Sequence, residues 1–254
     1  MGQEGGREPL LAGAHMIRIG ELERRGAAGE TSSSLGNRTT PVALIKAKGE
    51  QPMNITLIGA SDTFAGGFAT WAAAAGHEIT IVGPSRVQAE AFVEQLGAGL
   101  AAGPADRLRT EIVFAALPYV CLVDAWESYG DDLDGRVLVD VALPVDFAGT
   151  PVHLDAGSAA EALALARPRV RVVKAFHPGF VGAQGPGGGG AEERAVLLAG
   201  DDAGAKRLVA AVFDAGGMHA IDFGPLRRTR ELDALGFKLL RASVDARHAQ
   251  GGRV

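Results

Sequence analysis

Short apolar runs and longer helix-like segments alternate along the chain from Met53 onward. The first run, Asn54–Gly59 (NITLIG), is apolar and β-branched, which is typical of a buried strand. The next segment, Gly66–Ala75 (GGFATWAAAA), is rich in alanine and is followed by Gly76, a residue that commonly ends a helix. This order of strand and helix recurs up to the last helical segment.

The same criteria predict the remaining elements. Strands are expected at 78–83, 112–117, 136–142, 170–176, 194–199 and 218–223, and helices at 86–96, 120–129, 158–166, 201–215 and 229–246. Near-continuous apolar strands separated by helices indicate a parallel sheet covered on both faces. The predicted fold class is therefore α/β, a Rossmann-like doubly wound, mostly parallel sheet with a short C-terminal helical segment. Such sheets bind ligands at the carboxyl ends of their strands.

Residues 1–52 do not follow this pattern. They mix Gly, Glu, Arg, Ser and Thr with short apolar pieces, so they cannot bury enough surface to offset the entropy lost on ordering. We expect a mobile extension or a start-site artefact over 1–52, a Rossmann-like domain over 53–226 and a helical segment over 227–254. The Gly-rich stretch Gly182–Gly190 is either a plain linker or a flap over the ligand.

Composition narrows the class of partner. The 254 residues are 47% hydrophobic and 22% charged, which is ordinary for one soluble globular domain. A net charge of −5 argues against nucleic acid and anionic membranes. No apolar run reaches the roughly 18 residues that span a bilayer, and no secretory signal is recognisable. A single cysteine, Cys121, excludes an internal disulfide and fits a cytoplasmic location.

The first strand is followed by a turn that suits a phosphate only in part. A dinucleotide loop has the pattern G-x-G-x-x-G, in which glycines allow the backbone to approach the pyrophosphate closely. Only Gly59 fits that pattern, because either register leaves its second and third glycines unmet. The turn reads Gly59-Ala60-Ser61-Asp62-Thr63-Phe64. The helix N-terminus still offers amide groups to an anion, and Ser61 and Thr63 add hydroxyl donors. Asp62 is expected to cap the helix.

The second turn favours a phosphorylated ribose. An acidic residue normally binds the adenosine ribose at the end of the second strand, but this chain has Gly83-Pro84-Ser85-Arg86 there. Arg86 is able to pair with a 2′-phosphate, and Ser85 is able to donate to it. The structural alternative is that Ser85 caps a helix and Arg86 is solvated. We favour NADP over NAD because the acid is absent and a base is present.

Several segments, taken in order, resemble the NADP-dependent coenzyme F-420 oxidoreductase family. The similarity covers roughly residues 53–240, and its most specific part is the pair AGDDAGAK (199–206) and DFGPL (222–226). The other matching segments are AAAGHEITIVGPSR (73–86), ALPY (116–119), GSAAE (157–161) and VVKAFH (172–177).

The resemblance implies an NADP site across the strand ends, with a deazaflavin stacked on the nicotinamide. By matching position, Gly59, Ser61, Asp62, Thr63 and Phe64 meet the pyrophosphate. Ser85 and Arg86 meet the 2′-phosphate, and Ala116, Leu117 and Pro118 line the nicotinamide ribose. Val141–Pro144, which includes Ala142, and Ala175–Pro178 border the second ring. By analogy, the C-terminal helix would also form a homodimer.

The chain departs from the family in three places. The glycine loop is incomplete, Leu143-Pro144 stands where many relatives have Asn-Pro, and the C-terminal helical part is short. Two alternatives therefore accompany the F-420 hypothesis. One is an NADPH-dependent reductase of a small metabolite that does not use F-420. The other is a cofactor-free enzyme or ligand-binding protein on the same fold.

Two residues at the end of a predicted strand are candidates for chemistry. Lys174 and His177 would donate a proton to a carbonyl or imine substrate, which places them as the predicted catalytic residues. Alternatively, His177 only fixes the turn at Pro178. His153 and His219 have no metal-ligand partners at suitable spacing, so we expect no metal site.

Overall fold

The computed structural model describes residues 43–44, 52–59, 63–97, 100–103, 108–146, 150–181 and 195–249. The strands are β1 (Ala43–Leu44), β2 (Asn54–Ile58), β3 (Glu78–Val82), β4 (Leu100–Ala102), β5 (Ile112–Ala115), β6 (Val137–Asp140), β7 (Arg171–Phe176), β8 (Ala195–Ala199) and β9 (His219–Gly224). The helices are α2 (Thr63–Ala74), α3 (Arg86–Leu96), α4 (Tyr119–Tyr129), η1 (Gly130–Leu133), α5 (Ala159–Ala166), α6 (Pro178–Val181), α7 (Ala203–Ala215), η3 (Leu226–Arg228) and α8 (Thr229–Ala249).

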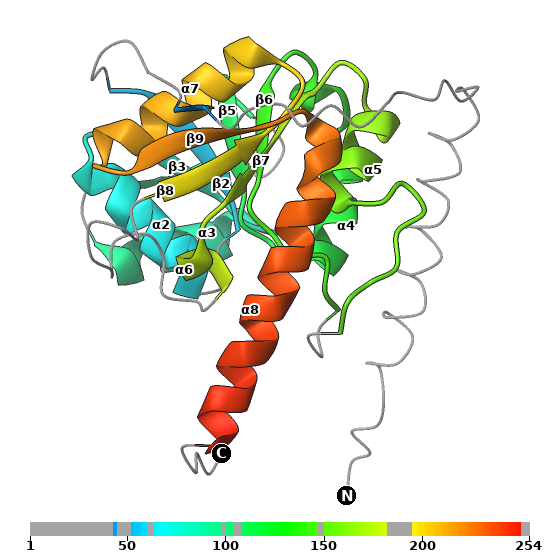
Figure 1. The fold of residues 1–254 in the computed structure, drawn as a ribbon. Helices are drawn as coiled ribbons and strands as arrows, with labels where there is room; N and C mark the ends of the chain where they lie inside the picture. The colour runs from blue at the N-terminus through cyan, green and yellow to red at the C-terminus, as the bar shows by residue number, and fades with distance from the viewer. Residues whose placement is uncertain are drawn as a thin grey trace, which may run out of the picture.

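Within these residues, one sheet of nine strands runs in the order β1-β9-β8-β7-β6-β5-β2-β3-β4 (Figure 1). Strands β2 to β7 pair in parallel, whereas β8 and β9 form a parallel pair that runs antiparallel to β7. The first strand of the domain, β2, lies between β3 and β5. The chain therefore winds outward in two directions from β2, and the predicted α/β doubly wound fold is confirmed.

Helices cover both faces of the sheet, which explains why the strands are apolar almost throughout. On one face, Ile112 and Phe114 of β5 pack with residues of α2 and α7. On the other face, Val113 and Ala115 of the same strand pack with residues of α4 and α5. The alternation of side chains along each strand thus supplies two separate cores.

Most helix and strand boundaries lie within a few residues of the predicted ones. Helix α2 begins at Thr63, three residues before the predicted start, and includes Gly66 and Gly67. The close approach of α2 and α3 favours glycine at position 66, because a Cβ atom there would lie 3.0 Å from Leu96 Cδ2. Strands β1 and β4 and helix α6 were not predicted, because each is too short to show a period.

Two other predictions fall mainly on residues outside the described ranges. The predicted extension over 1–52 is described only at 43–44, where β1 pairs with β9, and at Pro52. The Gly182–Gly190 stretch lies wholly outside the described residues. Both therefore remain predictions.

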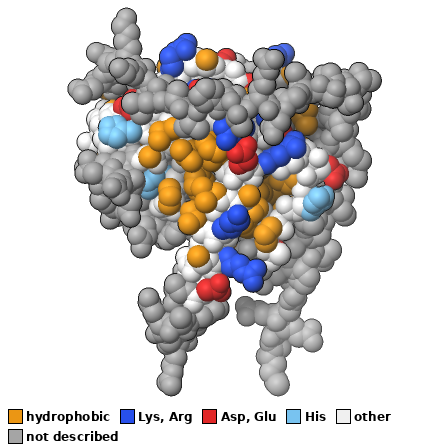
Figure 2. Space-filling view, viewed as in Figure 1, with side chains coloured by type: hydrophobic (Ala, Val, Ile, Leu, Met, Phe, Trp, Pro, Cys, Tyr) orange, Lys and Arg blue, Asp and Glu red, His pale blue; other side chains and the backbone are white. Residues whose placement is uncertain are grey.

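Helix α8 is the last element of the fold. It crosses the sheet beside β7, and its C-terminal part projects beyond the body of the domain (Figure 1). Beside it, half-buried Leu197, Phe223 and Leu239 pack against a small buried cluster. Hydrophobic side chains gather on this face of the molecule (Figure 2). The predicted C-terminal helical segment is therefore a helix of 21 residues.

An aromatic cluster joins α2, β5 and α7 on the first face of the sheet. The ring of Phe68 is fully buried and lies with its centroid 4.4 Å from that of Phe114 and 6.4 Å from that of Phe213. Trp71 closes the cluster at 5.7 Å from Phe68. These contacts hold α2 against the strand that leads into the candidate site.

Replacing Phe68 with alanine is expected to lower the free energy of unfolding by about 3–5 kcal/mol, because it leaves a cavity among three other rings. Val87→Ala is the matched control, since Val87 is 75% exposed and should change stability by less than about 0.5 kcal/mol. Urea denaturation of both variants tests this. Similar losses for the two would show that the cluster is not part of the cooperative core.

Candidate functional site

The carboxyl ends of β2, β3 and β5 meet at the point where the strand order reverses. Gly59 follows β2 directly, has φ of +136°, and donates its N–H to the Val82 carbonyl at 2.9 Å. A Cβ atom at position 59 would lie 2.2 Å from the carbonyl oxygen of Ala116. The backbones of the first and third turns therefore touch here, which only glycine permits.

The structure describes only part of the predicted phosphate turn. Ser61 and Asp62 lie outside the described residues, so the capping role of Asp62 remains a prediction. Thr63 and Phe64 are the first residues of α2, and the turn therefore precedes a helix N-terminus as predicted. A helix N-terminus attracts anions through its unpaired amide groups and its dipole.

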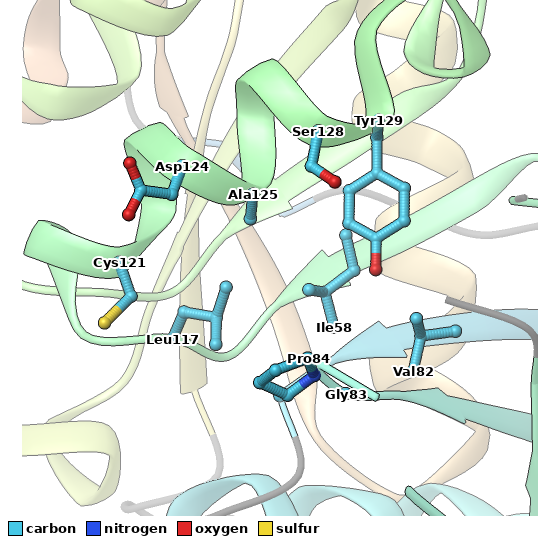
Figure 3. Close-up of a pocket in the computed structure, with 11 residues that line it drawn as sticks. Ile58, Val82, Gly83, Pro84, Leu117, Cys121, Asp124, Ala125, Ser128 and Tyr129 are labelled. Carbon is cyan, nitrogen blue, oxygen red and sulfur yellow. The ribbon is translucent and has the colours of Figure 1, made fainter. Parts of the chain in front are cut away.

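A cavity of about 320 Å³ opens beside this turn (Figure 3). Helix α4 supplies one wall through residues spaced one and two turns apart on one face. The strand ends and the β3–α3 turn supply the rest. The lining residues are Ile58, Gly59, Val82, Gly83, Pro84, Leu117, Cys121, Asp124, Ala125, Ser128 and Tyr129. A mostly apolar cavity with a few polar groups is typical of a small-molecule site.

The polar groups of the cavity all come from α4. Burial raises the pKa of Tyr129 to about 12, so its hydroxyl is neutral at pH 7 and is able to donate a hydrogen bond. Burial also raises the pKa of the Cys121 thiol, with a smaller contribution from the Asp124 carboxylate. Cys121 is therefore a neutral thiol rather than a nucleophilic thiolate. This face of α4 was not predicted as part of a site, although its spacing of three and four residues is visible in the sequence.

The second turn lies at the rim of the same cavity. Ser85 caps α3, because its Oγ accepts the Gln88 N–H at 3.3 Å. Arg86 has a side chain 70% exposed and pairs with Glu90 at 2.6 Å, which raises its pKa. Ser85 thus caps the helix, as the structural alternative predicted. A phosphate-binding role for Ser85 or Arg86 remains a prediction.

The third turn runs from β5 into α4. Ala116 is buried against Gly59, Leu117 lines the cavity, and Pro118 is an exposed residue directly before α4. The structure therefore brings Leu117 into the same cavity wall as Gly59. Pro118 is not among the lining residues, and its predicted contact with a ribose remains a prediction.

A second group of polar residues lies at the carboxyl ends of β6 and β7. The Lys174 ammonium is 1% exposed and lies 3.1 Å from Asp140 Oδ2 and 3.1 Å from Asp233 Oδ1 of α8. It also donates to the Ala142 carbonyl. Asp140 and Asp233 were not predicted. A charged residue ending the apolar strand VLVD was the available signal for Asp140.

The charges in this cluster do not balance, because two carboxylates face one ammonium. Burial raises the pKa of Asp233, the nearby Asp140 adds to this, and Lys174 opposes it. Burial by itself would lower the pKa of Lys174, but the two carboxylates more than offset it, and the lysine stays charged. Asp233 Oδ1 is the least satisfied atom, since its contact is an ion pair without a well-directed hydrogen bond.

His177 is buried at the end of β7, three residues beyond Lys174. Its Nδ1 accepts the Gly179 N–H at 3.0 Å, which holds the turn into α6. In the neutral ring this leaves the hydrogen on Nε2. The turn-fixing alternative is therefore present in the fold, and a catalytic role for Lys174 or His177 is still a prediction.

The two segments that carry the most specific part of the resemblance, 199–206 and 222–226, are joined by hydrogen bonds. Lys206 of α7 donates to Asp222 Oδ1 at 2.6 Å, and Asp201 Oδ1 accepts the Leu226 N–H at 2.9 Å. Asp202 caps α7 by accepting the Ala205 N–H at 2.7 Å. These bonds tie the turn after β8 to the turn after β9. The most specific part of the resemblance thus maintains the fold, at a distance from the cavity lining.

Two further observations concern the described part of the chain. No group of three or more His, Cys, Asp or Glu side chains there comes together as a metal site. No helix there is both long and apolar enough to cross a membrane.

Comparison with known proteins gives one family and a set of similar folds. Residues 54–144 match the family model described as NADP oxidoreductase, coenzyme F-420-dependent. No curated protein matches the chain. A protein of Arthrobacter sp. FB24, provisionally described as an F-420-dependent NADP reductase, is 24% identical with a TM-score of 0.61. That match covers 78% of this chain and 95% of the other.

Two other solved structures share the fold at lower or similar identity. A hypothetical protein of Sinorhizobium meliloti is 23% identical, with a TM-score of 0.60, over 69% of this chain and 86% of the other. An imine reductase of Myxococcus stipitatus in complex with NADP+ is 15% identical, with a TM-score of 0.54. The match covers 78% of this chain and 63% of the reductase. At these identities the structures support the fold alone.

The Asp233 carboxyl predicts a specific dependence of stability on pH. Its pKa is raised in the folded protein, so the folded state holds a proton that the unfolded chain has lost. Stability from this group is present below its ordinary value of 3.8 and is lost as pH rises through the folded pKa. Asp233→Asn removes this loss, because the amide does not titrate.

Urea denaturation between pH 4 and 7 measures this effect. The stability of Asp233→Asn relative to wild type should rise with pH across that window. Asp245→Asn, an exposed position on the same helix, should follow the wild-type curve. A constant difference between wild type and Asp233→Asn would show that the carboxyl titrates normally.

Proposed function

We propose that the chain is an NADP(H)-dependent oxidoreductase and a divergent member of the family of coenzyme F-420-dependent NADP oxidoreductases, whose model matches residues 54–144. The observation that carries the proposal is the cavity walled by α4 at the switch point of the sheet. Its apolar walls suit the faces of a purine, and Asp124 and Ser128 offer hydrogen-bonding groups to the rest of an adenosine.

The backbone approach at Gly59 supports the fit of a dinucleotide. Gly59 is held against Ala116 with no space for a Cβ atom, so the backbone of the turn lies close to the ends of the strands. A pyrophosphate would then be held by the amide groups that begin α2, with Thr63 close by in the chain. The missing glycines make this loop weaker than a complete motif, and the α4 wall is proposed to supply the remaining affinity.

Arg86 is proposed to select NADP over NAD. Its pair with Glu90 is exposed on one helix face, and such pairs contribute little to stability. Turning the guanidinium toward a 2′-phosphate therefore costs little. Ser85 adds a hydroxyl at the same rim.

The nicotinamide end is proposed to lie past Ala116, Leu117 and Pro118, toward Ala142. When bound, the cofactor supplies or accepts a hydride. The residues of this chain then bind and align the two partners and exclude water, which direct transfer between rings requires more than an acid or a base.

Coenzyme F-420 is the proposed hydride partner, on the strength of the family match. A small C=N or C=O substrate is the second candidate, and the observation that favours it is His177. This histidine is buried at the end of β7 with its Nδ1 engaged, so Nε2 is the ring atom that holds the proton. A reduction that proceeds with NADPH and no deazaflavin would favour the second candidate.

Titration with NADPH and NADH, followed by nicotinamide fluorescence, tests the cofactor. We expect micromolar binding of NADPH and weaker binding of NADH. Arg86→Ala should weaken NADPH on the order of tenfold and leave NADH unchanged, because only NADPH has the 2′-phosphate. Arg207→Ala, an exposed arginine on α7, is the matched control.

Filling the cavity tests its role independently. Ala125 lines the cavity from α4, so Ala125→Phe should weaken both nucleotides by at least about tenfold while urea denaturation stays close to wild type. Failure of wild type to bind either nucleotide would overturn the proposed function. It would direct attention to a cofactor-free role of the same cavity.

A further inference from the structure

Three elements meet at the Lys174 ammonium, and this meeting is not used by the proposed nucleotide site. Lys174 lies on β7, Asp140 ends β6 and Asp233 belongs to α8, and their residues are 1%, 0% and 4% exposed. An ammonium has three N–H groups, and three oxygens surround this one, from Asp140, Ala142 and Asp233. Asp140 and Ala142 accept hydrogen bonds from it, and Asp233 is its ion-pair partner.

The same contacts hold the turn that follows β6. Asp140 Oδ1 accepts the Ala142 N–H at 2.9 Å, and the Ala142 carbonyl accepts from Lys174. Both backbone groups of Ala142 are thus fixed by the cluster. The turn continues with Val145, whose N–H donates to the Leu143 carbonyl at 2.8 Å.

Helix α8 contacts this turn a second time, one helical turn beyond Asp233. A Cβ atom at Gly236 would lie 2.3 Å from Leu143 Cδ2, so the Leu143 side chain occupies the space that glycine leaves. Asp233 and Gly236 are three residues apart and therefore lie on the same face of α8. One face of one helix thus meets the turn through both a charge and an apolar contact.

The start of α8 is anchored independently of that turn. Thr229 Oγ1 lies 2.6 Å from Ser158 Oγ, the cap of α5. Arg230 makes two bonds to Glu161, at 2.7 and 2.8 Å, and one to the Ala156 carbonyl at 3.1 Å. These bonds fix the position from which α8 reaches Lys174, so the helix acts as a strut between α5 and the turn.

We propose that Asp233, acting through Lys174, is a positioning residue that sets the turn Val141–Pro144 against the ring to be reduced or oxidised. The placement of a ring at this turn rests on the proposed function. A buried ion cluster is poorly explained by stability alone, because apolar residues of similar volume serve a core as well or better. Its hydrogen bonds from Lys174 to Asp140 and Ala142 are directional, and they fix a backbone at the carboxyl ends of β6 and β7, where ligands of this fold bind.

Removing the Asp233 acceptor tests the proposal without unfolding the protein. Asp233→Leu leaves one ammonium facing one carboxylate, a balanced pair, and Asp233→Asn retains an oxygen at the same place. Both lose the negative charge, so any difference between them isolates the acceptor. Gly236→Ala disturbs the same turn through Leu143, and Asp245→Leu repeats the leucine change on an exposed part of α8.

Three measurements report on the turn. In Asp233→Leu, hydrogen exchange of the peptide containing 141–146 should become at least about tenfold faster, while that of 63–82 stays unchanged. NADPH should bind within about twofold of wild type, with its fluorescence change on binding reduced. With coenzyme F-420 as acceptor, kcat should fall on the order of tenfold while KM for NADPH holds. Asp233→Asn should restore most of each value, and Gly236→Ala should reproduce the direction of Asp233→Leu.

Unchanged exchange at 141–146 in Asp233→Leu would overturn this inference and leave the proposed function intact. The same holds if exchange rises but bound NADPH fluoresces as in wild type, because the turn would then not touch the ring. Failure of wild type to bind NADPH would instead overturn the proposed function, and this inference with it.

Discussion

A lysine ammonium buried as deeply as that of Lys174 stays charged only if protein oxygens replace the water it has lost. Here the replacement comes from β6 and the turn after it and from α8, so these two segments are fixed to β7 at one atom. The spacing of the carboxyl ends of β6 and β7 and the course of the turn at Ala142 depend on this contact, which adds to the anchoring of α8 at Thr229 and Arg230. Two carboxylates, Asp140 and Asp233, face the one ammonium, so the cluster is not arranged for charge balance.

The two halves of the sheet are built by different means. Around β2, β3 and β5 the geometry comes from close backbone approach at Gly59 and from the face of α4, with few charges involved. Around β6 and β7 it comes from buried ions. This division fits a protein in which a nucleotide is held by shape at one end and two reacting groups are aligned at the other. Directional bonds hold an alignment more tightly than apolar packing does.

The fold was largely predictable because its strands and helices are long enough to show their periods. The first turn and Ser85 were also recognisable, since they stand at fixed places relative to predicted strands. The cluster around Lys174 was not, because the partner from α8, Asp233, lies 59 residues away and nothing in the local sequence marks the pairing. Local patterns predict elements, whereas buried ion pairs between elements require knowledge of which helix crosses which strand.

Leu143 and helix α8 are connected by the structure. Leu143 obtains its apolar contact only because Gly236 leaves space on α8, and Gly236 lies one helical turn from Asp233. A larger residue at 236 would displace Leu143, and a polar residue at 143 would face a helix surface that offers it no side-chain partner at 236. Helix α8 and the turn after β6 therefore form one complementary unit. A change in either is therefore expected to require a change in the other.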